Sequence, residues 1–370
     1  MLIGVPKEIK KQEHRIGLTP ESVKTLTKKG HRVLIENNGG FEAGFTNEDY
    51  KNAGGEIENN ASEIFKISDL IVKVKEPQKK EVEMIKEDQI IYTYLHLAAT
   101  KDLTEGLIKS KSICIAYETV TDNKGRLPLL APMSAVAGRM SIQAGAHSLE
   151  KNQKGRGLLL GGAPGAEPAN VVILGGGVVG ENAALIATGM RAKVFVVDKS
   201  FERLNELKKK FGDNINPVES NEKELKKLLK NCDLLIGGVL IPGAEAPKLI
   251  SREMIKSMKR GSVIVDVAID QGGCVETSKP TTHDNPTYLV DEVVHYCVAN
   301  MPGGVPRTST MALNKATLPL LTKIADLGYK KTLKEDKNYL AGLNVFKGEV
   351  TCKGVAEAFN LKYLSPESLI

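Results

Sequence analysis

The sequence has no tryptophan, only 5% aromatic residues, and no apolar run near the roughly 20 residues that a membrane-spanning helix needs. Its apolar start is also too short for a signal peptide. The five cysteines are an odd number and form no C-x-x-C pair, so neither a disulfide framework nor a zinc ribbon is indicated. We therefore expect a cytoplasmic protein with free thiols and no membrane partner.

The sequence also lacks a large excess of charge of either sign. The 51 basic and 45 acidic residues leave a net charge of +6, and the basic residues mostly lie in mixed Lys/Glu runs. Such runs are typical of solvated helix faces and not of nucleic-acid-binding surfaces. The histidines show no spacing suited to a metal site.

Glycine, in contrast, is abundant, with 35 residues in a chain of 370. A chain of this length forms two or three domains of roughly 150 residues each. Apolar and charged fractions of 41% and 26% are ordinary for a globular protein, which excludes disorder and a fibre. Many glycines indicate tight turns and close backbone approaches, which favours a nucleotide or cofactor binder.

Short apolar runs alternate along the chain with Lys/Glu-rich stretches of helical length, a pattern typical of βαβ units and parallel sheets. We therefore predict an α/β fold with two Rossmann-like domains, mostly parallel sheets and an active site in the cleft between the domains. The runs expected to form strands are residues 1–5, 31–36, 70–74, 89–95 and 112–117, then 170–174, 192–198, 232–238 and 261–269.

Two long helices are expected outside the strand-rich blocks. Residues 133–152 form a helical pattern whose Ala, Gly and Ser residues would let another helix approach closely, and we place a domain boundary just before it. After the Gly/Pro-rich stretch that ends the second block, Ser309 or Thr310 can cap another helix, for which Gly328 is a C-cap.

The strongest local signal is a glycine motif between two predicted strands. Gly175, Gly177 and Gly180 form a G-x-G-x-x-G frame that follows one strand and opens a helix, and Asp198 ends the next strand. In this arrangement the glycines admit a pyrophosphate, and the acid accepts hydrogen bonds from the adenosine ribose. A carboxylate there favours NAD over NADP. Arg203, one helical turn later, weakens that preference, because it can stack on adenine or tolerate a phosphate.

The first block offers three candidates for nicotinamide chemistry. Arg15 can form a bidentate pair with a carboxylate, Lys75 can polarise a carbonyl, and His96 stands alone between apolar residues. Lys75 and His96 follow predicted strands, where open α/β sheets bind ligands. Each has an alternative interpretation: His96 as a buried, hydrogen-bonded core residue, and the two cations as solvated side chains.

Asp270 is the candidate from the second block. It follows a predicted buried strand and precedes two glycines, which would place its carboxylate at the carboxyl edge of the sheet, near the nicotinamide. The alternative is an Asp that caps a turn.

Seven blocks of the sequence, in order, resemble the alanine dehydrogenase family of the bacterial hexameric type. The resemblance implies reversible oxidative deamination of L-alanine by NAD to pyruvate and ammonia, in homohexamers. It also implies a substrate domain built from both chain ends (1–129 plus 307–370) around an NAD-binding Rossmann domain (130–306). The blocks are "IGVPKEIKKQEHRIGLTP", "VKVKEP", "YLHLAA", "LAPMSAVAGRMS", "VVILGGGVVG", "IGGVLIPGAEAPKLISREMIKSMKRGSVIVDVAIDQGGC" and "YCVANMPGGVPRTST".

Roles follow from the resemblance at matching positions. Arg15 and Lys75 would hold the substrate carboxylate and keto oxygen, His96 would transfer protons at the substrate, and Asp270 would activate water. Beside the glycines, the cofactor would contact Ser134, Val178, Val179, Asp198, Arg203, Ser220, Val239, Leu240, Val267, Ala268, Ile269, Asp270, Lys279, Val298, Ala299, Asn300 and Met301.

The chain departs from the family at some positions. Lys323 and Leu327 stand where some members carry an acid and a histidine that bind a metal, so we expect no metal there. Lys279 replaces an Arg of some members, which keeps the charge but loses the bidentate fork. Two alternatives share the architecture: the NAD-binding subunit of proton-translocating transhydrogenase, which lacks equivalents of Lys75 and His96, and a saccharopine or lysine dehydrogenase with a larger substrate.

Overall fold

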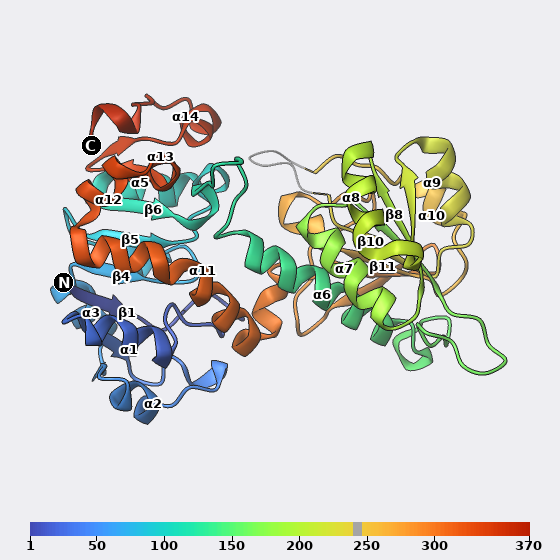
Figure 1. The fold of residues 1–370 in the computed structure, drawn as a ribbon, viewed down its shortest axis with the longest axis horizontal. Coiled ribbons are helices and arrows are strands. Elements are labelled where there is room, and N and C mark those ends of the chain that lie inside the picture. The colour runs from blue at the N-terminus through green and yellow to red at the C-terminus, as the bar shows by residue number, and fades with distance from the viewer. Residues whose placement is uncertain (240–245) are drawn as a thin grey trace. The chain divides into compact units, whose positions relative to one another are not determined.

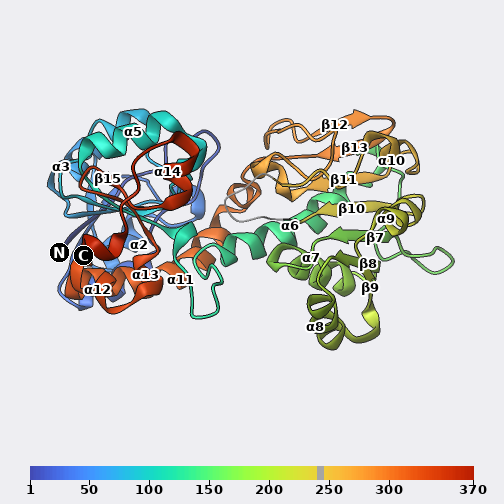
Figure 2. The ribbon, with the colours of Figure 1, turned by 90° about the horizontal axis from the view of Figure 1, so that it is seen from above.

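A computed structural model of the chain describes residues 1–239 and 246–370. The chain forms two compact units. The first is made of residues 1–133 and 305–370, and the second of residues 134–304. Each unit is an α/β sandwich around one sheet (Figures 1 and 2). Within the described ranges, no helix combines the length and apolar character needed to cross a membrane.

The first unit holds a sheet of eight strands in the order β15-β14-β6-β5-β4-β1-β2-β3. Strands β1 to β6 pair in parallel, and β14 joins β6 and β15 in antiparallel fashion. The elements are β1 (Leu2–Val5), α1 (Pro20–Lys28), β2 (Arg32–Glu36), α2 (Asn47–Asn52), β3 (Glu56–Glu58), α3 (Ala61–Ile67), β4 (Leu70–Val72), α4 (Lys79–Val82), β5 (Ile90–Thr93), α5 (Lys101–Ser110), β6 (Ile113–Ala116), α11 (Pro306–Leu327), α12 (Tyr329–Glu335), α13 (Lys337–Leu340), β14 (Leu343–Phe346), β15 (Glu349–Val350) and α14 (Lys353–Phe359).

The second unit holds a sheet of seven strands in the order β12-β13-β11-β10-β7-β8-β9, in which only the β12–β13 pair is antiparallel. Helix α6 (Ala131–Ser148) leads into it. The elements that follow are β7 (Asn170–Leu174), α7 (Val178–Gly189), β8 (Lys193–Asp198), α8 (Phe201–Phe211), β9 (Ile215–Glu219), α9 (Glu222–Leu229), β10 (Leu234–Gly237), α10 (Arg252–Lys256), β11 (Val263–Asp266), β12 (Thr287–Val290) and β13 (Val293–Tyr296).

Strands β10, β11 and β13 of the second sheet are buried throughout, and β7 is buried except at its first residue, so both of their faces call for apolar residues. In β7, Val171 and Ile173 pack with α7 and α8, while Val172 and Leu174 pack with α9 and α10 on the other face. In the first unit, α3, α5 and α14 cover one face of the sheet. The prediction of an α/β fold with two mostly parallel sheets is confirmed.

Helix ends follow local chemistry with one correction. Thr19 caps α1 through its side chain and Pro20 opens the helix, and Gly328 ends α11 with a φ of 77°. However, α11 begins at Pro306, so Ser309 and Thr310 are not its cap. Both are fully buried inside the helix, and the hydroxyl of Thr310 accepts the backbone N–H of Ile16 at 3.3 Å.

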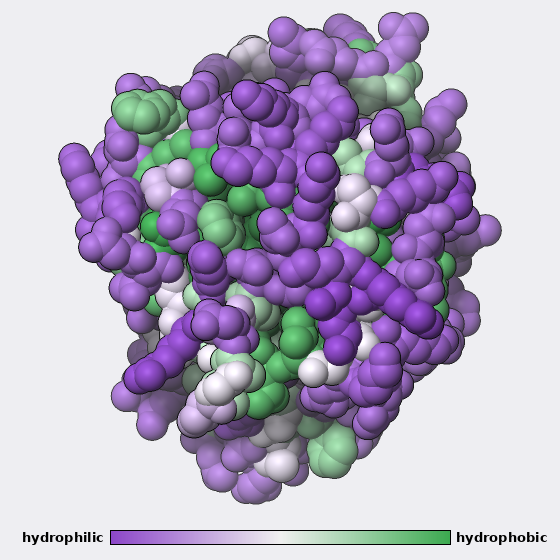
Figure 3. All heavy atoms as spheres, turned by 90° about the vertical axis from the view of Figure 1, so that its right-hand side faces the viewer, coloured by the Kyte–Doolittle hydropathy of each residue, from purple (hydrophilic) through white to green (hydrophobic). Residues whose placement is uncertain are grey.

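Most residues of the mixed Lys/Glu runs of the sequence lie on the surface, as predicted. Hydrophilic side chains cover most of the face shown in Figure 3, and apolar side chains appear between them in small groups. Most Lys and Glu residues of α8 and α9 are exposed or half-buried, as expected for amphipathic helices that cover a sheet.

Candidate functional site

Four neighbouring parallel strands of the first sheet, β1, β4, β5 and β6, end at the same edge. Arg15 follows β1, Lys75 follows β4 and His96 follows β5, so the structure brings the three predicted residues to one sheet edge. Glu118 follows β6 and joins them. The sequence analysis missed it, because a Glu behind an apolar run carries no signal of its own.

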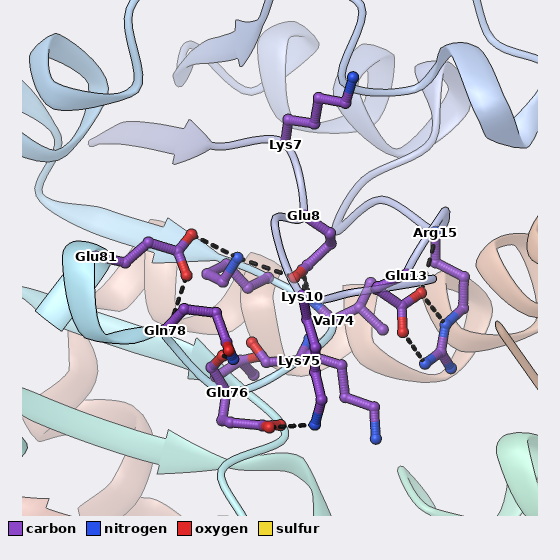
Figure 4. Close-up of polar contacts among 12 residues, drawn as sticks. Lys7, Glu8, Lys10, Glu13, Arg15, Val74, Lys75, Glu76, Gln78 and Glu81 are labelled. Carbon is purple, nitrogen blue, oxygen red and sulfur yellow. Dashed lines mark hydrogen bonds and ion pairs between the residues drawn. The ribbon is translucent and has the colours of Figure 1, made fainter. Parts of the chain in front are cut away.

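Arg15 is buried, with 2% of its surface exposed, so the alternative of a solvated cation is wrong. Its Nε and Nη2 donate to the two carboxylate oxygens of Glu13 at 2.6 Å each, and its Nη1 lies 3.1 Å from the sulfur of Met133 (Figure 4). Burial alone would lower the pKa of Arg15, but the hydrogen bonds and charge of Glu13 raise it above its ordinary value. The guanidinium therefore stays charged although it is buried.

The backbone at Lys75 is held from two sides. One oxygen of Glu8 accepts the N–H groups of Val74 at 2.6 Å and of Lys75 at 3.3 Å, and the hydroxyl of Thr93 donates to the carbonyl of Lys75 at 3.0 Å. The half-buried side chain of Lys75 and the buried side chain of Arg15 leave their backbones in the same direction in Figure 4. The loop after β4 is thus fixed relative to the neighbouring strands β1 and β5.

A buried ion cluster lies behind this loop. The ammonium of Lys73 is 2.9 Å from Glu8 and 2.8 Å from Glu81, and all three side chains are nearly fully buried. Burial by itself would lower the pKa of Lys73, but the charges of the two carboxylates raise it above its ordinary value. Burial raises the pKa of Glu8. Lys73 is therefore a structural cation, whereas Lys75, two residues later, leaves the cluster.

His96 is not a core residue, because 44% of its side chain is exposed. Its backbone adopts a left-handed conformation with a φ of 49°, and Glu118 accepts the N–H groups of His96 at 2.6 Å and of Leu95 at 3.1 Å. The imidazole stacks on Tyr94 with a centroid distance of 5.8 Å, and its Nδ1 lies 3.9 Å from Glu118. The imidazole is thus presented to solvent at a fixed place on the sheet edge.

The predicted cofactor residues form a second group, at the carboxyl edge of the second sheet. Six adjacent parallel strands end there. The glycine motif follows β7, Asp198 ends β8, Ser220 follows β9, Val239 follows β10, Val267–Asp270 follow β11, and Val298, Ala299, Asn300 and Met301 follow β13. Ser134 lies on α6, Lys279 lies in the loop before β12, and Leu240 lies outside the described residues.

The glycine motif has the geometry of a close backbone turn. Gly175 has a φ of 88°, and a Cβ at Gly180 would lie 1.8 Å from the carbonyl oxygen of Gly175, so both positions require glycine for the fold. Among the residues that the structure describes, a Cβ at Gly177 would meet nothing within 4 Å. Protein packing therefore gives no reason for glycine at the start of α7, whereas a ligand that approaches the backbone there does.

Asp198 and Arg203 bind the two backbone polar groups of Gly176 in this loop. The Oδ2 of Asp198 accepts the N–H of Gly176 at 2.6 Å, and the Nε of Arg203 donates to the carbonyl of Gly176 at 2.6 Å. A Cβ at Gly176 would lie 3.3 Å from atoms of both side chains. The sequence analysis placed Gly176 at a variable position of the motif and missed this role.

Asp270 requires a correction, because the strand before it ends earlier than predicted. β11 stops at Asp266, and residues 267–271 form a 3-10 helix. Buried Asp266 turns the chain by accepting the N–H groups of Ala268 at 3.1 Å and Cys274 at 2.9 Å. Asp270 is exposed instead, and its carboxylate accepts the N–H of Asn300 at 3.1 Å, which joins the loops after β11 and β13. The turn-capping role belongs to Asp266.

Comparison with known proteins shows the family. The alanine dehydrogenase/PNT N-terminal domain matches residues 4–137, and the corresponding C-terminal domain matches residues 141–353. The chain belongs to the alanine dehydrogenase/PNT family. It is 55% identical over 370 residues to an alanine dehydrogenase of Halomonas elongata and 53% identical over 371 residues to one of Methanococcus maripaludis, with all of each chain covered.

Solved structures of the family agree with the fold. An L-alanine dehydrogenase superposes with a TM-score of 0.94 at 50% identity, covering 97% of this chain and 99% of its own. A transhydrogenase from Sinorhizobium meliloti superposes with a TM-score of 0.83, covering 95% of this chain and all of its own, but at 21% identity it shares the fold alone. Members of this family named alanine dehydrogenase are thus far more similar to the chain than this transhydrogenase is.

Proposed function

We propose that this protein is an alanine dehydrogenase. It oxidises L-alanine with NAD and water to pyruvate, ammonia and NADH, and it catalyses the reverse amination. The observation that carries the proposal is the 55% identity, over the full length of both chains, to a protein named alanine dehydrogenase. The alternatives of a transhydrogenase subunit and of a saccharopine or lysine dehydrogenase have no comparable support.

The residues around the glycine motif fit NAD. The open position at Gly177 leaves room for a pyrophosphate at the N-terminus of α7, and the carboxylate of Asp198 lies at the end of β8, where a ribose hydroxyl can donate to it. NAD supplies the hydride acceptor. We assign cofactor contacts to Ser134, Gly175, Gly177, Val178, Val179, Gly180, Asp198, Arg203, Ser220, Val239, Leu240, Val267, Ala268, Ile269, Asp270, Lys279, Val298, Ala299, Asn300 and Met301.

Arg15 and Lys75 serve as the substrate anchors in this proposal. Glu13 occupies the Nε side of the Arg15 guanidinium and balances its charge, so Arg15 contributes hydrogen-bond donors more than net charge. We assign the second cation of the substrate site to Lys75, which would hold the keto oxygen and part of the carboxylate. This division of roles refines the assignment made from the sequence.

His96 and Asp270 handle the protons. Hydride leaves Cα only when the amine is neutral, so a base must first take its proton. Water then adds to the imine, and the resulting carbinolamine expels ammonia. His96 presents its exposed imidazole for proton transfer at the substrate nitrogen and oxygen, and the carboxylate of Asp270 activates the water. Assembly into hexamers and a cytoplasmic location are further parts of the proposal.

A substrate panel tests the function. Purified full-length protein is mixed with NAD and, in turn, L-alanine, D-alanine, glycine, L-serine, L-lysine and saccharopine, and NADH formation is followed. We expect kcat/KM to be highest for L-alanine, with a loss of about tenfold or more for a substrate that is larger by one polar group. Faster turnover of L-lysine or saccharopine, or no turnover of L-alanine, would sink the proposal.

A further inference from the structure

Arg203 lies in a cluster of charges beside the glycine motif, on α8. Its Nη1 donates to Glu206 at 2.7 Å, and its Nη2 donates to Glu181 on α7, in addition to the bond from Nε to Gly176. Lys210 donates to the other carboxylate oxygen of Glu181. Each of the three guanidinium nitrogens is thus directed at an acceptor of the protein itself.

The cluster carries no excess of positive charge. Arg203 and Lys210 pair with Glu181 and Glu206, and Asp198 binds the N–H of Gly176 while Arg203 binds its carbonyl, so two cations lie near three carboxylates. Burial alone would raise the pKa of Glu181, but hydrogen bonds from Lys210 and Arg203 hold it below its ordinary value. The carboxylate is therefore ionised, and the positive charge of Arg203 is locally cancelled.

The two acidic partners differ in strength. The side chain of Glu181 is 25% exposed, whereas that of Glu206 is 66% exposed. Solvent screens an exposed pair and leaves it little energy, so Glu181 is the stronger partner of Arg203. Glu181 also comes from a different helix, which ties the start of α8 to α7.

An arginine near the end of the second strand is the group that accommodates the 2′-phosphate of NADP in dinucleotide-binding folds. We propose that Glu181 is a specificity-determining residue, which occupies and neutralises Arg203 so that this arginine cannot bind a 2′-phosphate. Glu206 adds a smaller contribution. The inference rests on the proposed use of NAD and extends it: two features exclude NADP, the repulsion by Asp198 and the masking of Arg203 by Glu181.

Neutralising Asp198 alone then leaves the pairing of Arg203 with Glu181 in place. In Asp198→Asn the repulsion is gone, but Arg203 is still paired with Glu181, so we expect only a small gain in NADPH affinity. The double variant Asp198→Asn/Glu181→Gln releases the guanidinium. One charge-assisted hydrogen bond to a phosphate should then lower the Kd for NADPH by about tenfold relative to Asp198→Asn.

The experiment measures Kd for NADH and NADPH by fluorescence titration of the full-length protein at constant ionic strength. The variants are Asp198→Asn, Glu181→Gln, their combination, and the combination with Arg203→Met. Glu222→Gln is the matched control, because Glu222 pairs with Lys226 within α9 and touches neither the glycine motif nor Arg203 in the described contacts. We expect the control to bind both nucleotides as the wild type does.

The Arg203→Met arm separates the arginine from the lysines nearby, since Glu181→Gln also releases Lys210. The gain in NADPH affinity should disappear in the triple variant. A gain that survives there, or equal changes for NADH and NADPH in the double variant, overturns the inference. The binding of NADH by each variant reports that the domain is folded. If the wild type binds no NADH, the proposed function itself fails; if it binds NADH but the double variant does not gain NADPH affinity over Asp198→Asn, only this inference fails.

Discussion

Three carboxylates, two buried and one half-buried, bind the candidate reactive residues of this protein. Glu13 takes one side of the Arg15 guanidinium, Glu8 binds the backbone at Lys75, and Glu118 binds the backbone at His96. Each is an acceptor of fixed position that restricts one reactive residue. Because desolvated charges without a partner are costly, these pairs bear on stability as well as on activity.

Removing the Arg15 side chain should lower both the stability of the protein and its affinity for the substrate. Arg15→Ala leaves Glu13 buried without its partner, so we expect the free energy of unfolding to fall by about 3–5 kcal/mol and the KM for L-alanine to rise. In Arg15→Ala/Glu13→Ala the stranded charge is gone, so most of the stability should return while the KM stays high. Urea unfolding and steady-state kinetics on both variants measure these effects. A normal KM in the double variant would show that Arg15 is structural and does not anchor the substrate.

The residues named from the sequence and those missed differ in one physical respect. Arg15, Lys75 and His96 carry chemistry that can be recognised by type and by position after a strand. Glu8, Glu13 and Glu118 are ordinary in type, and their importance comes from the hydrogen bonds they accept, which depend on which loops meet at the sheet edge. Asp266 was missed for the same reason, since its place at the end of β11 is visible only once the strand end is known.

At the scale of elements, chemistry is concentrated where parallel strands end. The three predicted reactive residues of the first unit follow β1, β4 and β5, and the predicted cofactor residues of the second mostly follow six adjacent strands. The glycines of the motif are needed for two different reasons, the fold of the loop and the approach of a ligand. Gly175 and Gly180 are required by the fold, whereas Gly177 faces open space.

Alanine substitutions along this segment should therefore separate folding from binding. Gly180→Ala forces a Cβ against the carbonyl of Gly175, and we expect it to lower the free energy of unfolding by about 3 kcal/mol. Gly177→Ala should cost about 1 kcal/mol or less, as a change at a helix N-cap, but weaken NADH binding about tenfold or more. Gly189→Ala, at the far end of α7 with nothing within 4 Å, is the control and should change neither.

Thermal unfolding of the three variants measures the effect on stability, and NADH titration measures the effect on cofactor binding. Unchanged NADH affinity in Gly177→Ala would mean that no pyrophosphate lies against that position, and the assignment of the cofactor site would be wrong.

The strands predicted from the sequence were continuous apolar runs, but two buried strands, β13 and β14, were missed along with the polar ones. The runs with continuous β-branched residues became strands, because burial on both faces demands such residues. Three of the missed strands, β3, β9 and β15, lie at the edges of their sheets and are short or polar. Such a strand forms only by pairing with the adjacent strand of the sheet, so its own residues carry a weak signal. Helix α11 starts before its predicted cap because Pro306 can open a helix without one.

At the scale of the whole molecule, residues far apart in the chain complete one sheet. β14 and β15, formed by residues 343–350, extend the sheet that the first 116 residues build, through antiparallel pairing of β14 with β6. No local pattern marks such a pairing, since it depends on long-range contacts. Similarity over the whole chain carried information that residue types and periodicity lacked, including the identity of the substrate.

The central claim is that hydride passes from Cα of L-alanine to NAD, and isotope transfer measures it most directly. The protein is incubated with NAD and L-alanine that carries deuterium at Cα, and the NADH and pyruvate formed are analysed by mass spectrometry and NMR. We predict one deuterium at C4 of the NADH for each pyruvate released, with ammonia in equal amount. NADH that forms without deuterium, or pyruvate that forms without NADH, would contradict the account.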